Sequence, residues 1–248
     1  MTRSLRVFAL EGMPEIEEGD DLAELIAEAA VRSGGLEDGD VVVVAQKVVS
    51  KAEGRVVRLD EVEASERAYE LANGERDARH LQVVLDEAAR IVRSRPPLVI
   101  AETHHGFVCA SAGVDASNAK GPGTLVLLPV DPDASAGHIR EGLRERSGRD
   151  VGVVVSDSFG RAWRQGTTDV ALGTAGIEAL RDLRGLRDAA GYELQGTQIA
   201  IADELAGAAE LVLGKTSGCP AAVVRGLDVR GEGSGRDLVM PPERDLFR

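Results

Sequence analysis

The chain has 248 residues, 43% of them hydrophobic and 29% charged, a length and composition typical of one large globular domain or two closely packed lobes. The formal net charge of −13 excludes a broad basic surface, so we expect no binding to nucleic acid or to an anionic membrane. An anionic ligand would need local cations, backbone N–H groups or a metal ion. The two cysteines, Cys109 and Cys219, form no C-x-x-C pair, which favours a reducing compartment without disulfides.

The first 15 residues, MTRSLRVFALEGMPE, contain no apolar stretch typical of a signal peptide. No apolar run approaches the roughly 18 residues that span a bilayer. We therefore expect a cytoplasmic protein without a membrane segment.

Hydrophobic periodicity predicts strands and helices in a mixed order, and hence an α+β fold with mixed sheets and flanking helices. Strands are expected at 5–10, 40–46 (buried on both faces), 55–59, twice within 97–110, at 123–129 and at 150–158. Helices are expected from an N-cap at Asp20 to Gly34, twice within 61–94 with a break at Asn73-Gly74, and at 131–148 and 197–214. The stretch 230–237, RGEGSGRD, is expected to be flexible.

Several familiar motifs are absent. LGKTSG at 213–218 resembles the end of a P-loop, but that pattern requires glycine where the chain has Ala209, and a helix rather than a strand precedes it. His104-His105 lacks a spaced carboxylate partner and favours a turn or a strand edge. Neither G-x-S-x-G nor H-E-x-x-H occurs, so serine hydrolase and zinc protease chemistry are poor interpretations.

Polar and charged residues crowd the stretch 156–176, SDSFGRAWRQGTTDVALGTAG, directly after an apolar run. Asp157 lies where the predicted strand ends, and the adjacent Ser158 hydroxyl makes a pair that suits Mg²⁺ or Mn²⁺ rather than zinc. Arg161 and Arg164 are three residues apart, so on a turn or at a helix start they can face one anion. A solvated polar loop would use the same residues, and this stretch alone leaves both interpretations open.

A second polar segment, residues 109–121, also follows a predicted strand and offers Asp115, Ser117 and Asn118. Mg²⁺ is typically held by few carboxylates together with phosphate oxygens, so two strand-end aspartates fit a cation bound to a phosphate. A lone aspartate in a glycine-rich turn is also a common turn former. The paired segments favour the cation site.

The positions of the lysines are a third indication of a phosphate-binding site. The chain has four of them, and all are expected in loops rather than on helix faces. Compact ammonium groups in loops suit contact with phosphate, although solvated loop lysines are the alternative. The four are Lys47, Lys51, Lys120 and Lys215.

A set of motifs follows in order along the chain: GDDLAELI, GDVVVVAQKVVSKAEGRVV, GVDASN, LLPVDPDASA, SDSFGRAWRQGTTDVALGTAGI, ADELAGAAELVLGK and VVRGL. From the first strand to the terminal DLF, which is similar to the bacterial branch, this set resembles the coenzyme F420:L-glutamate ligase family. The resemblance implies a GTP-dependent ligase that attaches L-glutamate through γ-linkages to the lactyl-phosphate tail of the deazaflavin F420 precursor. It also implies two divalent sites for Mg²⁺ or Mn²⁺, a frequent need for K⁺, and a two-lobed monomer in an intertwined homodimer.

The resemblance also assigns residues. It places GTP on Met13, Pro14, Glu15, Ile16, Gln46, Lys51 and Asn118, the first metal on Asp115 and Asp157, and the second metal on Ser158. Ser158 stands where threonine is commoner, which keeps the hydroxyl. Gln46 stands where residue type varies. From position and charge, we infer that Arg161 and Arg164 clamp the anionic tail of the acceptor, so that the expected catalytic set is Asp115, Asp157, Arg161 and Arg164.

The resemblance implies that residues 1–248 form one ligase domain of two lobes, without the reductase-like C-terminal domain that many bacterial relatives carry. Two other functions remain open. One is a nucleotide- and metal-binding module that depends on a partner. The other is a metal-dependent phosphohydrolase, which strand-end aspartates alone would permit.

Overall fold

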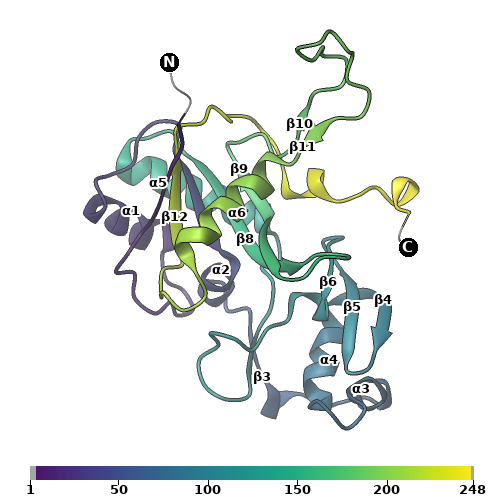
Figure 1. The fold of residues 1–248 in the computed structure, drawn as a ribbon. Helices are drawn as coiled ribbons and strands as arrows, with labels where there is room; N and C mark the ends of the chain where they lie inside the picture. The colour runs from purple at the N-terminus through teal and green to yellow at the C-terminus, as the bar shows by residue number, and fades with distance from the viewer. Residues whose placement is uncertain (1–3, 247–248) are drawn as a thin grey trace.

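The computed structural model describes residues 4–246 and has the expected α+β architecture with mixed sheets. A five-stranded sheet forms its centre (Figure 1). Strands β2 and β8 run parallel, and the other neighbours in the sheet are antiparallel. In spatial order the strands are β1 (Arg6–Ala9), β12 (Ala221–Arg225), β2 (Val41–Ala45), β8 (Gly152–Gly160) and β9 (Thr167–Ala175).

Helices cover both faces of this sheet. Helices α1 (Leu22–Arg32) and α5 (Pro132–Ser147) pack on one face, and α6 (Ile201–Leu213) crosses the other (Figure 1). Because side chains alternate along a strand, Val42 and Val44 of β2 join the core under α1 and α5, whereas Val41 and Val43 join the core under α6. The prediction of a strand buried on both faces is confirmed.

The helix caps follow the sequence closely. Helix α5 begins after Asp131, whose carboxylate accepts the backbone N–H of Ala134, and ends at Gly148 in the left-handed conformation. The N-cap of α1 is Asp21 rather than the predicted Asp20. The Asp20 carboxylate instead accepts a backbone N–H in the preceding turn, which leaves Asp21 to cap the helix.

A second group of elements has its own apolar core. It contains a two-stranded sheet, a three-stranded sheet and two helices, drawn below the central sheet in Figure 1. These are β3 (Val56–Arg58) with β7 (Thr124–Val126), then β4 (Ala88–Arg95), β5 (Leu98–Thr103) and β6 (Val108–Ala110), and the helices α3 (Glu66–Ala72) and α4 (Ala78–Glu87).

The expected break between two helices is confirmed at Asn73, which adopts a left-handed conformation. The second helix is shorter than predicted, however, because residues 88–95 form strand β4 and pair with β5. The composition of AARIVRSR does not by itself predict a strand. These residues form one because they pair with the edge of β5.

The remaining helical elements are short: η1 (Leu59–Glu61), η2 (Ser111–Gly113), η3 (Gly235–Leu238) and η4 (Pro242–Arg244).

The polar stretch after the central strand is not a loop. Strand β8 continues through Ser156, Asp157 and Ser158 to Gly160 and pairs with β9 in a long hairpin, after an irregularity in register between Val155 and Ser156. The prediction that the strand ends at Asp157 was therefore wrong. The hairpin turn lies at residues 161–166.

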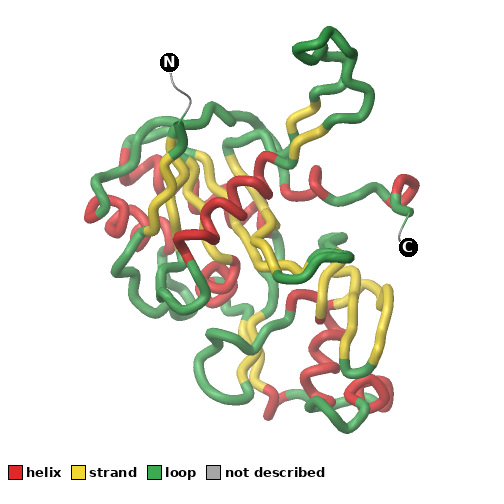
Figure 2. Tube along the Cα trace, viewed as in Figure 1, coloured by secondary structure: helices red, strands yellow, loops and turns green. Residues whose placement is uncertain are grey.

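One segment lies outside the packed layers. Strands β10 (Arg181–Asp182) and β11 (Gln198–Ile199) form the base of an arm whose loop extends away from the rest of the molecule (Figure 2).

The glycine-rich stretch 230–237 was predicted to be flexible, but it packs closely against the rest of the chain, so this prediction was wrong. Gly233 and Gly235 lie so close to the backbone of Ala179 and Leu172 that an added Cβ would approach within 2.2 and 2.1 Å, and Asp133 accepts the N–H of Gly235. No helix within residues 4–246 is long and apolar enough to cross a membrane.

Candidate functional site

The candidate site lies at one edge of the central sheet, and the strand order explains why. Strand β2 ends at this edge, where Ala45 pairs with Ser156, and the parallel strand β8 continues beyond it with its polar residues. Strand β12 runs antiparallel to β2, so the loop before Ala221 arrives at the same edge. The segment after β1 arrives there too, because Ala9 pairs with Ala222. Segments far apart in the sequence therefore converge, as is usual at the carboxyl ends of strands in open sheets.

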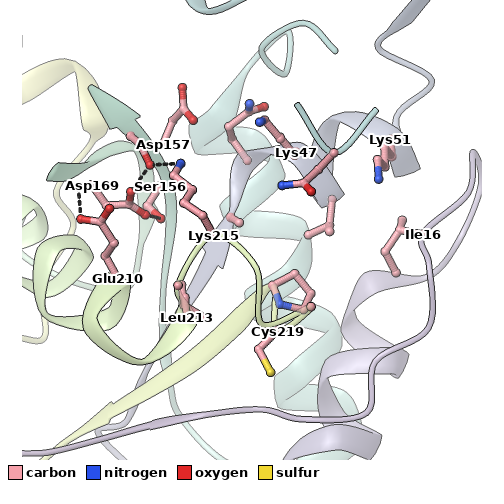
Figure 3. A pocket seen from close by; sticks show the side chains of 18 of the residues that line it. Ile16, Lys47, Lys51, Ser156, Asp157, Asp169, Glu210, Leu213, Lys215 and Cys219 are labelled. Atoms are coloured by element: carbon pink, nitrogen blue, oxygen red, sulfur yellow. Dashed lines mark hydrogen bonds between the residues drawn. The ribbon is translucent and has the colours of Figure 1, made fainter. Parts of the chain in front are cut away.

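A cavity of about 330 Å³ lies at this edge. Its walls come from the segment after β1, from α2 (Gln46–Ala52), from the polar part of the β8–β9 hairpin and from the loop after α6 (Figure 3). Of the predicted nucleotide-contacting residues, Pro14, Glu15, Ile16, Gln46, Lys51 and Asn118 line it, together with Asp157 and Ser158. Met13 belongs to the buried core instead.

A network of side chains surrounds the end of β8. Ser158 and Asp169 face each other across the hairpin, and the serine hydroxyl donates to the Asp169 carboxylate at 2.5 Å. The Ser156 hydroxyl donates to the second oxygen of the same carboxylate at 3.0 Å. Glu210 of α6 accepts the backbone N–H of Asp169 at 3.0 Å. Asp169 is 7% exposed, so the two serines hold an almost buried negative charge.

Asp157 points to the other face of β8 and is half-buried. Burial raises its pKa to about 6, although the Ser158 backbone and the ammonium groups of Lys47 and Lys215 favour the charged form. A carboxylate that is costly to ionise in this way is a ready ligand for a cation.

Asp115 and Asp157 share a cavity. Asp115 lies beside β7 in the second group of elements, where its backbone pairs with Val126, and its carboxylate accepts a hydrogen bond from Lys47 at 2.5 Å. Burial opposes its ionisation, but the hydrogen bonds from Lys47 and Ser117 outweigh burial and lower the pKa of Asp115. Both aspartates line a hollow of about 300 Å³ that also includes Ser158 and Lys215. Two distant carboxylates are thus brought together.

Three of the four lysines line this cavity, and two of these three are not in the predicted loops. Lys47 and Lys51 lie on helix α2 rather than in a loop, because the strand β2 is followed at once by a helical turn. Lys51 is nearly buried and donates to Glu15 at 2.5 Å. Lys215, from the loop after α6, donates to the Ser158 hydroxyl. All three line the first cavity, which gives a positively charged wall to a strongly acidic protein.

Gln46 supplies an independent sign of a polar ligand. Its side chain is 1% exposed and lines the first cavity, and its oxygen accepts from Ser50 at 2.8 Å. Within the part of the chain that the structure describes, its buried Nε2 has no hydrogen-bond partner. A buried donor without a partner is costly, so this amide is suited to a ligand that supplies an acceptor oxygen.

The donor set fits a divalent cation only in company with a ligand. Asp115, Asp157 and Ser158 offer the hard oxygen donors that Mg²⁺ and Mn²⁺ prefer. Across residues 4–246, no group of three or more His, Cys, Asp or Glu side chains is placed to hold a metal ion alone. The remaining coordination would have to come from phosphate oxygens and water, as is common for Mg²⁺.

Arg161 and Arg164 lie elsewhere. They occupy the exposed turn of the hairpin, where Arg161 donates to the Gln165 carbonyl at 3.0 Å, and neither arginine is among the residues that line the two cavities. Their contact with an acceptor stays a prediction.

Sequence reasoning missed part of the site. Asp169 belongs to the crowded polar stretch 156–176 but, like Ser156, was assigned no role, although pairing across the hairpin places both on one face with Ser158. Glu210 and most of the loop after α6 were missed as well. The signal for that loop was the GKTSG segment, which is unsuited to a P-loop but contributes Gly214, Lys215, Thr216 and Gly218 to the cavity, next to Cys219.

The fold and the site define an α+β protein whose central sheet ends in a cavity lined by carboxylates, serine hydroxyls and lysines. The chain belongs to the F420-0:gamma-glutamyl ligase family, which matches residues 12–226. It is 46% identical over 252 residues to the coenzyme F420:L-glutamate ligase of Methanopyrus kandleri, covering 99% of this chain and 98% of that protein. The enzymes of the same description from Methanothermobacter thermautotrophicus and Methanocaldococcus jannaschii are 41% and 44% identical, with at least 98% of every chain covered.

Proposed function

We propose that this protein is a coenzyme F420:L-glutamate ligase that uses GTP to attach L-glutamate, through γ-linkages, to the deazaflavin precursor of coenzyme F420. The observation that carries the proposal is that Asp115 and Asp157 line one hollow beside three lysines, in a chain that matches ligases of this family over nearly its full length. The two groups of elements would act as two lobes of one ligase domain.

Joining a carboxylate to an amine in water requires that the carboxylate is activated. We propose that the γ-phosphoryl group of GTP passes to the acceptor carboxylate, which gives an acyl phosphate and GDP. The glutamate amine then attacks the acyl carbon, phosphate leaves with the bonding electron pair, and the amine loses a proton. No covalent nucleophile from the protein is needed, so its residues act by position and charge.

The acceptor and GTP are both anions, and their repulsion must be offset. Lys51 and Lys47 on α2 and Lys215 after α6 place ammonium groups around the proposed phosphate position. Asp115 and Asp157 would hold the first Mg²⁺ or Mn²⁺ ion, and Ser158 the second. Bound there, these ions would neutralise charge on the phosphates during transfer. K⁺ is proposed as a supporting cation, which replacement of K⁺ by Na⁺ in the assay buffer would test.

The nucleotide is proposed to lie against residues 14–16, Gln46, Lys51 and Asn118. The unpartnered amide of Gln46 supports this placement, because a nucleotide oxygen would satisfy it. Met13 would act from the core, by fixing the segment that follows it.

We also propose a homodimer. The arm between β10 and β11 extends from the molecule and exposes Leu186 and Tyr192 to 55% and 64%. A second copy would cover such apolar side chains. Sedimentation velocity of the wild type and of a Leu186→Ser, Tyr192→Ser variant would test this, with a dimer expected for the first and a monomer for the second.

The direct test of function is a mass assay. The pure protein is incubated with GTP, Mn²⁺, L-glutamate and F420-0, and the expected products are glutamate adducts of F420-0 with GDP and phosphate in equal amounts. GTP consumption that needs neither glutamate nor F420-0 would identify a phosphohydrolase instead. Adducts that form only after a separate protein fraction is added would identify a partner-dependent module.

A further inference from the structure

A second, larger cavity lies farther along the β8–β9 hairpin, toward its turn. It has a volume of about 600 Å³ and walls that are largely apolar. The tip of the hairpin forms one wall, the strands β4–β6 another, and the segment after η3 a third. Ile100, Val108, Phe159, Trp163, Val239 and Met240 provide the apolar surface.

Three aromatic side chains, Phe107, Phe159 and Trp163, line this cavity. Phe159 and Phe107 pack edge to face, with ring centroids 6.4 Å apart and an angle of 80° between planes. Trp163, at the hairpin tip, is 81% exposed. In a chain with only 3% aromatic residues, this concentration is a specific feature of one place.

Strand β8 connects this cavity to the candidate site. Asp157 and Phe159 are two residues apart and therefore lie on the same face of the strand, roughly 7 Å apart along it. Asp157 lines the nucleotide cavity and the hollow that holds Asp115, and Phe159 lines that same hollow and the apolar cavity. The three spaces thus follow one another along a single strand.

We propose that the apolar cavity binds the planar aromatic head of the acceptor, so that its anionic tail reaches the hollow between Asp115 and Asp157. This inference rests on the proposed function. Small-molecule sites are typically concave, mostly apolar and a few hundred Å³ in volume, with few polar groups at the rim. Arg93 and Asp203 supply such groups here. A second copy of the chain would also bury apolar side chains, but it would not require a continuous path to the carboxylates.

The tryptophan content of the chain allows a direct test, because Trp163 is its single tryptophan. F420-0 is titrated into the intact protein without GTP, and Trp163 emission is followed with N-acetyltryptophanamide as the control for light absorption by the ligand. We expect saturable quenching by F420-0 and none by 2-phospholactate, which represents the tail without the head. Absence of quenching by F420-0 in a protein that ligates it would overturn the proposal.

Kinetics of variants provide the second measurement. Trp163→Ala and Met240→Ala, on separate walls, should each raise the KM for F420-0 about tenfold and leave the KM for GTP unchanged. Tyr69→Ala, which removes an exposed ring from α3, is the matched control and should change neither. The two side chains at the cavity are 81% and 49% exposed, so the fold should persist, as circular dichroism would verify.

The outcomes separate this inference from the proposed function. If F420-0 quenches Trp163 emission in the wild-type protein but no glutamate is attached to it, the proposed function alone is overturned. Wild-type protein that ligates, with variants whose KM for F420-0 is unchanged, would overturn the aromatic site. If those variants instead change the sedimentation coefficient at constant KM, the cavity is an interface between copies of the chain, which also overturns it.

Discussion

Ser158 and Asp169 are direct neighbours across the β8–β9 hairpin, with the serine hydroxyl 2.5 Å from the aspartate carboxylate. Ser158 is a predicted cation ligand. Through this contact it is held by Asp169, a nearly buried carboxylate that is not itself a predicted ligand. The carboxylate fixes the direction of the hydroxyl proton, and hence the direction in which the Ser158 lone pairs face the cavity.

The first prediction follows from this contact. In Asp169→Asn, one carboxylate oxygen becomes an NH₂ group, which cannot accept from both serines. The variant should lose roughly 10- to 100-fold in turnover and need more Mn²⁺ for half-maximal activity, as is typical when a partner of a metal ligand is removed. Asp60→Asn changes an exposed aspartate paired with Arg58 and is the control. Equal Mn²⁺ dependence in wild type and Asp169→Asn would contradict the assignment.

The second prediction concerns Asp115. Its carboxylate is the only predicted cation ligand outside the central sheet's hairpin, so Asp115→Asn should lower turnover at least about 100-fold. The fold should be kept, because the backbone of Asp115 rather than its side chain pairs with Val126. Turnover and circular dichroism check the two parts. Near-normal turnover at modest Mn²⁺ would count against a metal role for this residue.

The third prediction is a pH dependence of stability. Burial raises the pKa of Asp157 from 3.8 to about 6, so ionisation of this group above pH 6 costs folding free energy, while below about pH 3 it is protonated in both states. Asp157→Asn should therefore be more stable than wild type above pH 6 in the presence of a chelator, by roughly 1–2 kcal/mol after allowance for solvent screening. The difference should vanish at about pH 3.

Urea unfolding at pH 8 and at about pH 3 measures this difference. Asp60→Asn again serves as control, with no gain expected at either pH. If Asp157→Asn is no more stable than wild type at pH 8, burial does not raise the free energy of the ionised Asp157 carboxylate. Activity is expected to fall by orders of magnitude in the same variant, so gain of stability and loss of function should occur together.

The fourth prediction tests the packing that supports the hairpin. A Cβ at Gly173 of β9 would lie 2.2 Å from the backbone carbonyl of Pro132, at the start of α5. Gly173→Ala should therefore destabilise the protein by about 1–3 kcal/mol or more. Gly137 lies within α5 and has no atom within 4 Å of its Cβ position, so Gly137→Ala should stabilise it by about 0.5–1 kcal/mol. Thermal unfolding of both variants gives the sign directly.

Much of the fold was predictable because its signals are local. The valine run of β2 and the capped pattern of α5 each determine an element from neighbouring residues. The errors occurred where an element depends on a partner. Residues 88–95 are a strand because β5 offers an edge, and Ser156 to Gly160 continue β8 because β9 pairs with them.

The residues of the site also divide into those predictable from the local sequence and those that depend on a partner element. Asp115 and Asp157 could be selected from residue type and position after apolar runs, and the structure places them around one hollow. Asp169 and Glu210 could not, because their contacts arise from strand pairing and from helix α6 crossing the sheet. The placement of Lys47 and Lys51 on one helix likewise depends on how β2 ends.

The most direct test of the central claim is the position of the metal. A crystal of the protein with GDP and Mn²⁺ is measured at a wavelength where manganese scatters anomalously. The account predicts a peak between the carboxylates of Asp115 and Asp157, in contact with a phosphate oxygen of the nucleotide. A nucleotide bound with its manganese away from both carboxylates would contradict it.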